Sequence, residues 1–226
     1  MGLPAAFAEF HVCLEGKSDI ATAGARYIST LSNQEVTLEK YGAGSIVVAD
    51  YDPSWPTLFE QERIRIRKAL GSFAFVIEHI GSTAVPGLPS KPIIDLLVGV
   101  PSLEEAKERC IEPFEELGYI YIPDYARWLP GELFFRKGPP GPWTHHVHLM
   151  EPSHRRWEAR LVFRDYLRAH PEAARAYANI KRALATSSID DIEAYTTGKH
   201  TFIKDTTEKA HAWRARMQDS ESSSPD

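Results

Sequence analysis

The stretch of residues 78–100, EHIGSTAVPGLPSKPIIDLLVGV, decides the fold of this chain. Its first residues close an apolar, β-rich run over 73–80, which stops at Gly81. A short connection rich in Gly, Ser, Thr and Pro follows, and then a nearly continuous apolar run over 92–100. Runs of this second kind are typical of a central strand that is covered on both faces. We therefore predict two strands that are joined by a compact turn.

The segments on either side of this stretch predict further strands and helices. Before it, an apolar run at 45–49 predicts a short strand, and helical spacing over 56–70 predicts a helix that ends at Gly71. After it, Ser102 and Glu105 form a capping box that begins a second helix. Three more β-rich segments predict strands at 119–122, 133–137 and 144–150.

Beyond residue 151 the pattern is helical only, with helices predicted over 153–170, from Pro171 onward and from Ile189 onward. The predicted fold class is therefore α+β, with a mixed αβ half followed by a C-terminal helical half. The domain organisation that we predict has a partly disordered extension at 1–44, one domain at 45–217 with an αβ half (45–151) and a helical half (152–217), and a disordered tail at 218–226.

Composition and charge exclude several classes of protein. The 226 residues carry 26 Lys and Arg against 31 Asp and Glu, and the formal charge of −5 argues against general nucleic-acid binding. No apolar window reaches the roughly 18 residues that a membrane span needs. Cys13 and Cys110 form no CxxC motif and are expected to be free thiols in a reducing compartment, so we predict a cytoplasmic protein.

The connection between the two central strands has the residue types of an anion site. Gly81 lets the backbone pass close to a ligand, and Ser82 and Thr83 can offer hydroxyl and backbone N–H groups to an anion. Asp95, inside the buried strand, is costly unless it is paired, protonated or bound to a cation. Lys91 adds a positive charge beside the turn. A tight turn, an Asp satisfied by backbone donors and an ordinary loop Lys remain the alternative.

The histidines of the segment THHVHLM, residues 144–150, form a second candidate group. By the alternation of a strand, His146 and His148 share one face and His145 points to the other. Two imidazoles and the Asp95 carboxylate would suit a transition metal better than Mg²⁺. Histidines that are packed or hydrogen-bonded near a sheet edge are the alternative.

Two lysines lie on apolar helix stripes, where a charge is unexpected. Lys181 follows Tyr177 by four residues, and Lys199 follows Tyr195 by four. Each must extend its ammonium past the edge of the interface, pair with an acid, or reach an anion between the sheet and the helices. Arg164 could supply a further cation there, or form a surface pair with its neighbour Asp165.

Four segments together resemble one known family: HIGSTAVPGL with KPIIDLLVGV, THHVHLMEPS, FRDYLRAHP and AYTTGKHTFI. They are similar to the GrpB-like family, which is assigned to the nucleotidyltransferase (polymerase-beta-type) fold superfamily. The resemblance covers residues 45–213, and the family also occurs fused to dephospho-coenzyme A kinase. It implies an α+β fold, a nucleotidyltransferase-like mixed β-sheet with flanking helices, followed by a C-terminal helical segment.

In that superfamily a Gly-Ser turn holds the terminal phosphates of a nucleotide, and two alternating acids hold divalent metal. Gly81 and Ser82 match the turn, Asp95 matches the first acid, and Leu97 stands at the second acidic position. The resemblance places Trp143 where the family often has an Arg, for which Arg136 could compensate. The site that we predict has catalytic Asp95 and His148; phosphate or substrate ligands Gly81, Ser82, Thr83, Lys91, Lys181 and Lys199; and metal ligands Asp95, His146 and His148.

The function implied is a nucleotidyltransferase-type enzyme that acts on a nucleotide or an acidic small molecule, with a divalent metal, Mg²⁺ or a transition metal. Because Leu97 cannot bind metal, two alternatives stay open: ligase or hydrolase chemistry on the same scaffold, and a non-catalytic module that binds a nucleotide or another anion. The sequence predicts no membrane partner and carries no signal for an oligomeric state.

Overall fold

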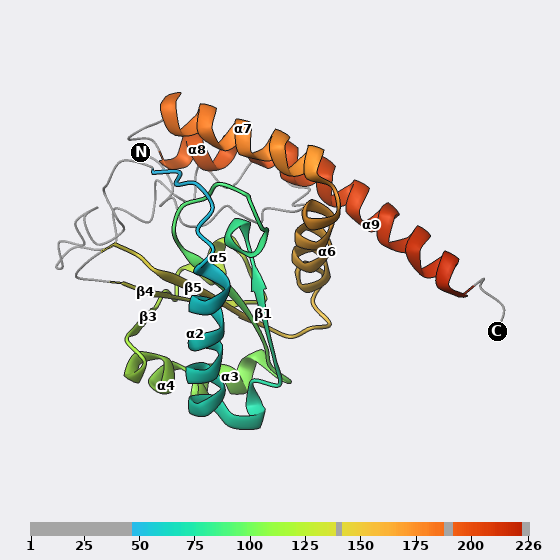
Figure 1. Cartoon of the computed structure of the whole chain (residues 1–226). Coiled ribbons are helices and arrows are strands. Elements are labelled where there is room, and N and C mark those ends of the chain that lie inside the picture. Colours follow the sequence, from blue (N-terminus) through green and yellow to red (C-terminus); the bar gives the residue numbers. More distant parts are fainter. Residues whose placement is uncertain (1–46, 139–141, 188–191, 223–226) are drawn as a thin grey trace.

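The computed structural model of the chain describes residues 47–138, 142–187 and 192–222 (Figure 1). The predicted extension at 1–44 lies outside these residues. In the labels of Figure 1, the helices are α2 (Trp55–Leu70), α3 (Leu103–Arg109), α4 (Ile111–Glu116), α5 (Tyr125–Trp128), α6 (Arg155–Ala169), α7 (Pro171–Ser187), α8 (Ile192–Gly198) and α9 (His200–Ser222). The strands are β1 (Val76–Ile80), β2 (Ile94–Gly99), β3 (Tyr119–Tyr121), β4 (Leu133–Lys137) and β5 (His145–Met150).

The five strands form one mixed sheet in the order β1-β2-β5-β4-β3. β2 pairs with β5 in parallel, while the other neighbouring pairs are antiparallel. All six residues of β2 are buried, as its nearly continuous apolar run predicts for a strand covered on both faces. This arrangement confirms the α+β class and places the turn between β1 and β2 next to the start of β5.

One face of the sheet packs against helices from the first half of the chain. Ile66 of α2 and Phe114 of α4 contact a cluster that includes Leu96 of β2 and Val147 of β5. The N-terminus of α3 is capped as predicted, since the Ser102 side chain accepts from the backbone N–H of Glu105 at 3.3 Å. This face is mostly apolar and forms the larger core of the protein.

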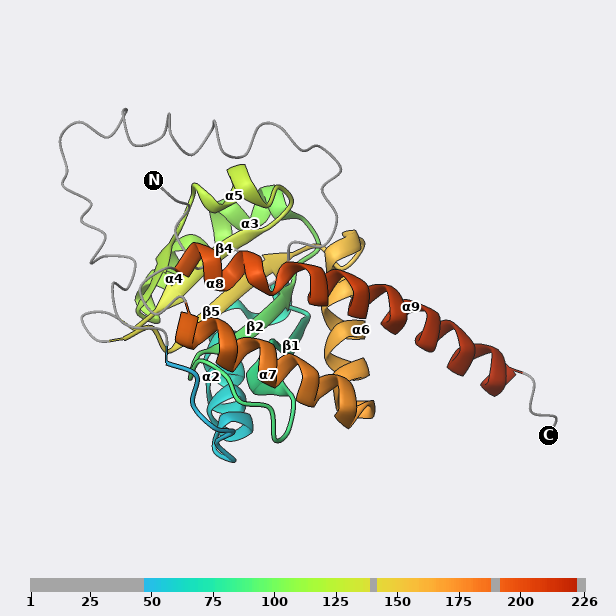
Figure 2. The same ribbon diagram turned by 90° about the horizontal axis from the view of Figure 1, so that it is seen from above.

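The opposite face packs against the helical half. Leu97 of β2 lies in a cluster with Phe163 of α6, Tyr177 of α7 and Ile203 of α9. Figures 1 and 2 show α7 and α9 running side by side over this face, with the C-terminal part of α9 extending beyond the rest of the molecule. Because β2 also carries Asp95 on this face, the polar residues of the β1–β2 turn lie under the C-terminal helices.

Three predicted segments differ from the structure. Of the strand predicted at 45–49, residues 47–49 contribute only an isolated bridge between Ala49 and Ser90, and 45 and 46 lie outside the described residues. The strand predicted at 73–80 begins at Val76, because Gly71–Phe73 forms a 3₁₀ turn that closes α2. A short helix, α5, follows β3 where no helix is predicted.

The last helix differs at both ends. The segment from Ile189 is divided into α8 and α9, which meet at Lys199. The tail prediction also needs a correction, since residues 218–222 continue α9. A helix that already has many turns extends at little cost even through polar residues, so composition alone places its end too early. Residues 223–226 lie outside the description.

Within the described ranges, no helix is both long enough and apolar enough to cross a membrane.

Candidate functional site

The turn between β1 and β2 is built around one glycine. Gly81 has φ 71° and precedes a 3₁₀ turn over Ser82–Ala84, in which the backbone N–H of Val85 donates to Ser82 O at 3.1 Å. A β-carbon at Gly81 would collide with Oδ2 of Asp95. The turn therefore needs glycine for two reasons, its positive φ and the close approach of the Asp95 carboxylate.

The predicted turn, acid and histidine strand meet at this point. Asp95 of β2 pairs in register with Ile80 of β1 on one side and His146 of β5 on the other. Oδ1 of Asp95 lies 3.2 Å from Nδ1 of His146. The Asp95 side chain is only 6% exposed, and a polar partner of this kind offsets part of the cost of burying it. Asp95 therefore has a side-chain partner on the neighbouring strand.

The environment of His146 disfavours its charged form. Burial, followed by the charges of Arg136, His148 and Lys91, lowers the pKa of His146 well below its ordinary value. A neutral imidazole that faces a carboxylate carries its hydrogen on the nitrogen that donates, here Nδ1. Its buried Nε2 then presents a lone pair, and it makes no hydrogen bond to any residue that the structure describes.

Arg136 continues the same row of polar side chains. Asp95, His146 and Arg136 occupy paired positions on β2, β5 and β4. The Arg136 guanidinium carbon lies 5.3 Å from the ring centroids of Phe134 and Trp143. Arg136 is thus a buried cation beside the Asp95–His146 pair. It lies near the ring of Trp143, the residue at the position where the resemblance places an Arg in many family members.

His148 is directed to a different partner. Its Nδ1 lies 3.4 Å from Oε1 of Glu132, whose Oε2 lies 2.9 Å from Nη2 of Arg160. Burial raises the pKa of Glu132, but the charge of Arg160 and the hydrogen bond from His148 outweigh it and hold that pKa well below its ordinary value. The structure therefore brings His146, but not His148, to Asp95. Glu132 is not among the site residues predicted from the sequence. Arg156 and Arg160, two arginines at i and i+4 on α6, are the signal that could have indicated a buried acid.

Lys181 of α7 reaches the turn. Its Nζ donates to Ser82 Oγ at 2.8 Å and also to the carbonyl oxygen of Pro89. The ammonium lies 4.6 Å from the Tyr177 ring centroid, and the residue is buried. The alternative in which Lys181 extends to solvent past the interface is therefore excluded.

Lys199 and Lys91 approach one aromatic ring from two segments. Nζ of Lys199 lies 4.4 Å from the ring centroid of Tyr195, and Nζ of Lys91 lies 4.6 Å from the same centroid. Lys199 is 1% exposed, so its ammonium also stays inside the protein. All three predicted lysines therefore lie on the helical side of the sheet.

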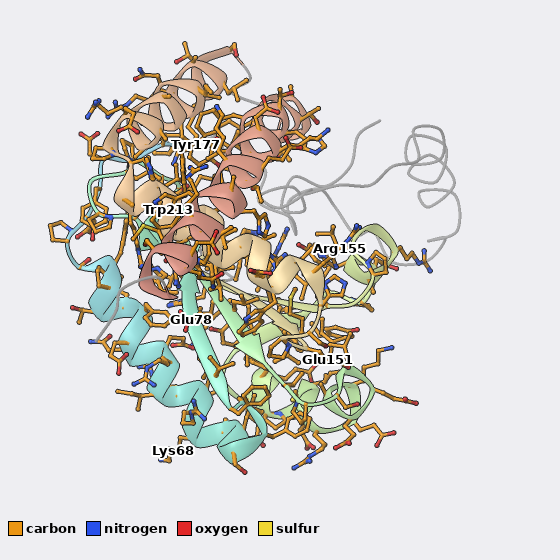
Figure 3. All side chains as sticks on the ribbon, turned by 90° about the vertical axis from the view of Figure 1, so that its right-hand side faces the viewer. Lys68, Glu78, Glu151, Arg155, Tyr177 and Trp213 are labelled. Carbon is orange, nitrogen blue, oxygen red and sulfur yellow. The ribbon has the colours of Figure 1, made fainter. Side chains whose placement is uncertain are left out.

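Thr83 and Arg164 have structural partners. The Thr83 hydroxyl donates to Ile93 O at 3.3 Å and lies 3.0 Å from Nε2 of His79, beneath the turn. Because that hydroxyl gives its one hydrogen to Ile93, Nε2 of His79 is the donor in the second contact. Arg164 binds Glu78 of β1 at 2.7 Å (Glu78 is labelled in Figure 3) and Asp165 at 2.8 Å. Thr83 thus supports the turn, and Arg164 joins α6 to β1.

The family model described as GrpB protein matches residues 45–209. The chain belongs to the GrpB family. This family is part of the nucleotidyltransferase-like superfamily, which confirms the expected relationship.

Relatives and a solved structure agree with this membership. The UPF0157 protein PA4798 of Pseudomonas aeruginosa is 46% identical over 70% of this chain and 64% of that protein. The UPF0157 protein YqkA of Bacillus subtilis is 37% identical over 77% of this chain and 50% of that protein. The crystal structure of conserved protein GrpB from Enterococcus faecalis superposes with a TM-score of 0.67 at 38% identity, over 73% of this chain and 96% of that one. The alignments thus span about half to two thirds of those two UPF0157 proteins.

The donor set of this GrpB protein does not fit a resident divalent metal. Among the residues described, no three His, Cys, Asp or Glu side chains group around a common point. Nδ1 of His146 contacts Asp95 itself, and His148 faces Glu132. Arg136 and Lys91 lie close enough to depress the pKa of His146, and positive charges at that range repel a metal cation. The geometry of Asp95 and His146 fits an acid–base pair. The divalent metal predicted from the sequence stays a prediction, which measurement of the metal content of the purified protein would test.

Proposed function

We propose that this GrpB protein is a nucleotidyltransferase-type enzyme that binds a nucleotide or another acidic small molecule at the Ser82 turn. One observation carries the proposal: Nζ of the buried Lys181 lies 2.8 Å from Ser82 Oγ. A helix 99 residues further along the chain thereby delivers an ammonium to the turn that resembles a phosphate-binding turn. A purely structural turn would gain little from a buried cation, since burying a charge is costly.

The groups at the turn suit a phosphate oxygen. The Ser82 hydroxyl and the Lys181 ammonium can both donate, and hydrogen bonds from a charged donor to phosphate are about twice as strong as neutral ones. Gly81 carries no side chain that would obstruct an approaching ligand. These contacts would neutralise and orient a terminal phosphate next to Asp95.

In this proposal, His146 acts as the general base that accepts the proton of the attacking group, and Asp95 orients it. As a hydroxyl or amine attacks the α-phosphorus of a nucleoside triphosphate, its proton passes to Nε2 of His146 while the bond from that phosphorus to the leaving pyrophosphate breaks. Asp95 holds Nδ1–H throughout and stabilises the imidazolium that forms. A Mg²⁺ ion that accompanies a nucleoside triphosphate belongs to the substrate in this scheme.

Leu97 favours a second candidate, in which the protein binds its anion without catalysis. Leu97 is fully buried in the apolar cluster beneath α6, α7 and α9, at the second acidic position of the superfamily. Without that acid, the metal-dependent chemistry of the superfamily loses a ligand, whereas anion binding at Ser82 and Lys181 is unaffected.

Calorimetric titration with ATP, with and without Mg²⁺, tests binding. We expect Lys181→Met to weaken ATP binding by roughly ten- to a hundredfold, the value of one charge-assisted hydrogen bond. Lys204→Met, an exposed Lys→Met change on α9, should leave it unchanged. Equal binding by wild type and Lys181→Met, or no binding by either, would overturn the proposal.

Release of pyrophosphate from ATP, in the presence of hydroxyl and amine acceptors, separates the two candidates. His146→Asn retains a donor near Asp95 but removes the Nε2 acceptor, so an enzyme should lose turnover while ATP affinity stays within about twofold. An ATP-binding protein that shows no turnover with any acceptor would support the non-catalytic module.

A further inference from the structure

Two backbone carbonyls that flank the Ser82 turn accept hydrogen bonds from arginines of α6. Arg164 donates to His79 O at 2.9 Å, and Arg168 donates to Ala84 O at 2.9 Å. Because the two arginines are four residues apart on a helix, they lie on the same face of it. The helix α6 therefore holds the backbone on both sides of Ser82.

The second of these contacts bears on the position of Ser82 itself. A peptide group is planar, so a partner that holds its carbonyl also fixes the direction of the N–H that follows. The N–H that follows Ala84 O belongs to Val85, and it donates to Ser82 O at 3.1 Å. Arg168 thus acts, through one planar peptide group, on the residue whose hydroxyl accepts from Lys181.

One carboxylate orients both arginines. Oδ1 of Asp165 accepts from Nε of Arg164 at 2.8 Å and lies 3.6 Å from Nη1 of Arg168. Burial raises the pKa of Asp165, but the hydrogen bond and the charge of Arg164 outweigh it and hold that pKa below its ordinary value. The carboxylate is therefore charged at neutral pH, and it offsets the repulsion between two arginines at i and i+4.

The other oxygen of this carboxylate binds α9. Oδ2 of Asp165 lies 2.6 Å from Nη2 of Arg214. The neighbouring Trp213, labelled in Figure 3, packs edge-on against Tyr166 of α6 with 5.9 Å between the ring centroids. Figures 1 and 2 show α9 crossing α6 before its last turns leave the body of the molecule. Asp165 therefore joins the contacts that come from α9 to those that hold the turn.

We propose that Asp165 is a positioning residue of the Ser82 turn. It holds Arg164 and Arg168 on the two flanking carbonyls, and through its second oxygen it makes the shape of the turn depend on the docking of α9. The proposal rests on the proposed function, because a ligand at Ser82 would respond to that shape with a change in affinity. The Asp165 and Arg214 side chains are 26% and 32% exposed, and ion pairs this exposed add little to global stability. The effect should therefore be local to the turn.

Amide hydrogen exchange of Val85, measured by NMR on the protein without ligand, reports local opening of the turn. Asp165→Asn keeps the size of the side chain but removes its charge and one acceptor oxygen. We expect this variant to exchange at Val85 faster, and to bind ATP more weakly, by roughly two- to tenfold, the equivalent of one hydrogen bond. Its urea midpoint and the exchange of Leu96 in β2 should stay close to those of wild type.

Variants of α9 repeat the test from the other side of the carboxylate. Arg214→Met should change Val85 exchange and ATP binding in the same direction as Asp165→Asn. Arg214→Lys, which keeps a charged donor, should restore part of both. Arg216→Met is the matched control, because it is an exposed Arg→Met change on the same helix, and it should alter neither.

The two proposals fail in different ways. The positioning role is overturned if Asp165→Asn leaves Val85 exchange unchanged, if Leu96 exchange rises by the same factor, or if ATP still binds with wild-type affinity while Val85 exchange rises. A change in Asp165→Asn that Arg214→Met does not share would overturn the dependence on α9. If wild type binds no ATP, the proposed function is overturned, and the comparison of Val85 with Leu96 still decides whether Asp165 positions the turn.

Discussion

Oδ1 of Asp95 lies 3.2 Å from Nδ1 of His146, across directly paired positions of the parallel strands β2 and β5. The other carboxylate oxygen, Oδ2, faces Gly81, where a β-carbon would collide with it. One carboxylate thus joins the β1–β2 turn to the imidazole. A change in the turn should therefore reach His146 through Asp95, although β1 and β5 are not neighbours in the sheet.

Replacing Gly81 tests this connection. Gly81→Ala should cost about 1–2 kcal/mol for a positive φ and, in addition, displace the Asp95 carboxylate. Gly87→Ala is a matched control, because Gly87 has φ 76° but open space around its Cβ position. Urea unfolding should show a larger loss for Gly81→Ala, and NMR should show a shifted His146 ring for this variant alone. Equal losses and an unmoved His146 signal would contradict the connection.

His79 should make the protein less stable in acid. Burial, followed by the charges of Arg168 and Arg164, lowers the pKa of His79 to about 3. Below its ordinary pKa of 6.5 the unfolded chain binds a proton that the folded chain refuses, so stability falls as the pH drops from 6.5 towards 3, by up to roughly 5 kcal/mol.

His79→Gln keeps a donor for Thr83 and removes this titration. The variant should be less stable than wild type near neutral pH, because the substitution removes the stacking of His79 on Phe59. Urea unfolding from about pH 8 down to about pH 4 should show this gap closing, because only wild type loses the His79 contribution. A gap that stays constant over this range would mean that His79 titrates normally in the folded protein.

Glu132 should be a strong determinant of stability. It is fully buried between His148, Arg156 and Arg160, and removing one member of a buried ion pair costs about 3–5 kcal/mol. Glu132→Gln should therefore lower the denaturant midpoint strongly. Glu105→Gln, whose pair with Arg109 is more than half exposed, should change little. Similar midpoints for the two variants would show that the buried network adds no net stability.

Leu97→Asp tests whether the missing second acid explains the poor fit to a metal. Leu97 is buried in register with Glu78 and His148, so a carboxylate there should destabilise the fold. We expect calorimetry to detect tighter Mg²⁺ binding by this variant than by Leu97→Asn, which adds polarity without charge. A folded Leu97→Asp variant with no gain would indicate that this family member has built its site around other ligands.

The sequence by itself determined the order of most helices and strands and the location of the turn. These follow from local physics: a continuous apolar run predicts β2, a glycine ends β1, and a capping box begins α3. The resemblance of four segments to one family added the mixed sheet and the superfamily. Where the local pattern was weak, as in the polar residues 218–222, the end of a helix was misplaced, because extension of an existing helix depends on the turns before it.

Only the tertiary structure decided which groups share the site. His146 and His148 lie on the same face of β5, and the register of β5 against β2 brings the first to Asp95 and leaves the second beside Glu132. Periodicity placed Lys181 on an apolar stripe but did not say where its ammonium lies, and the packing of α7 over the turn brings that ammonium to Ser82. Contacts of this kind join residues tens of positions apart, and nothing in the local sequence encodes their distance.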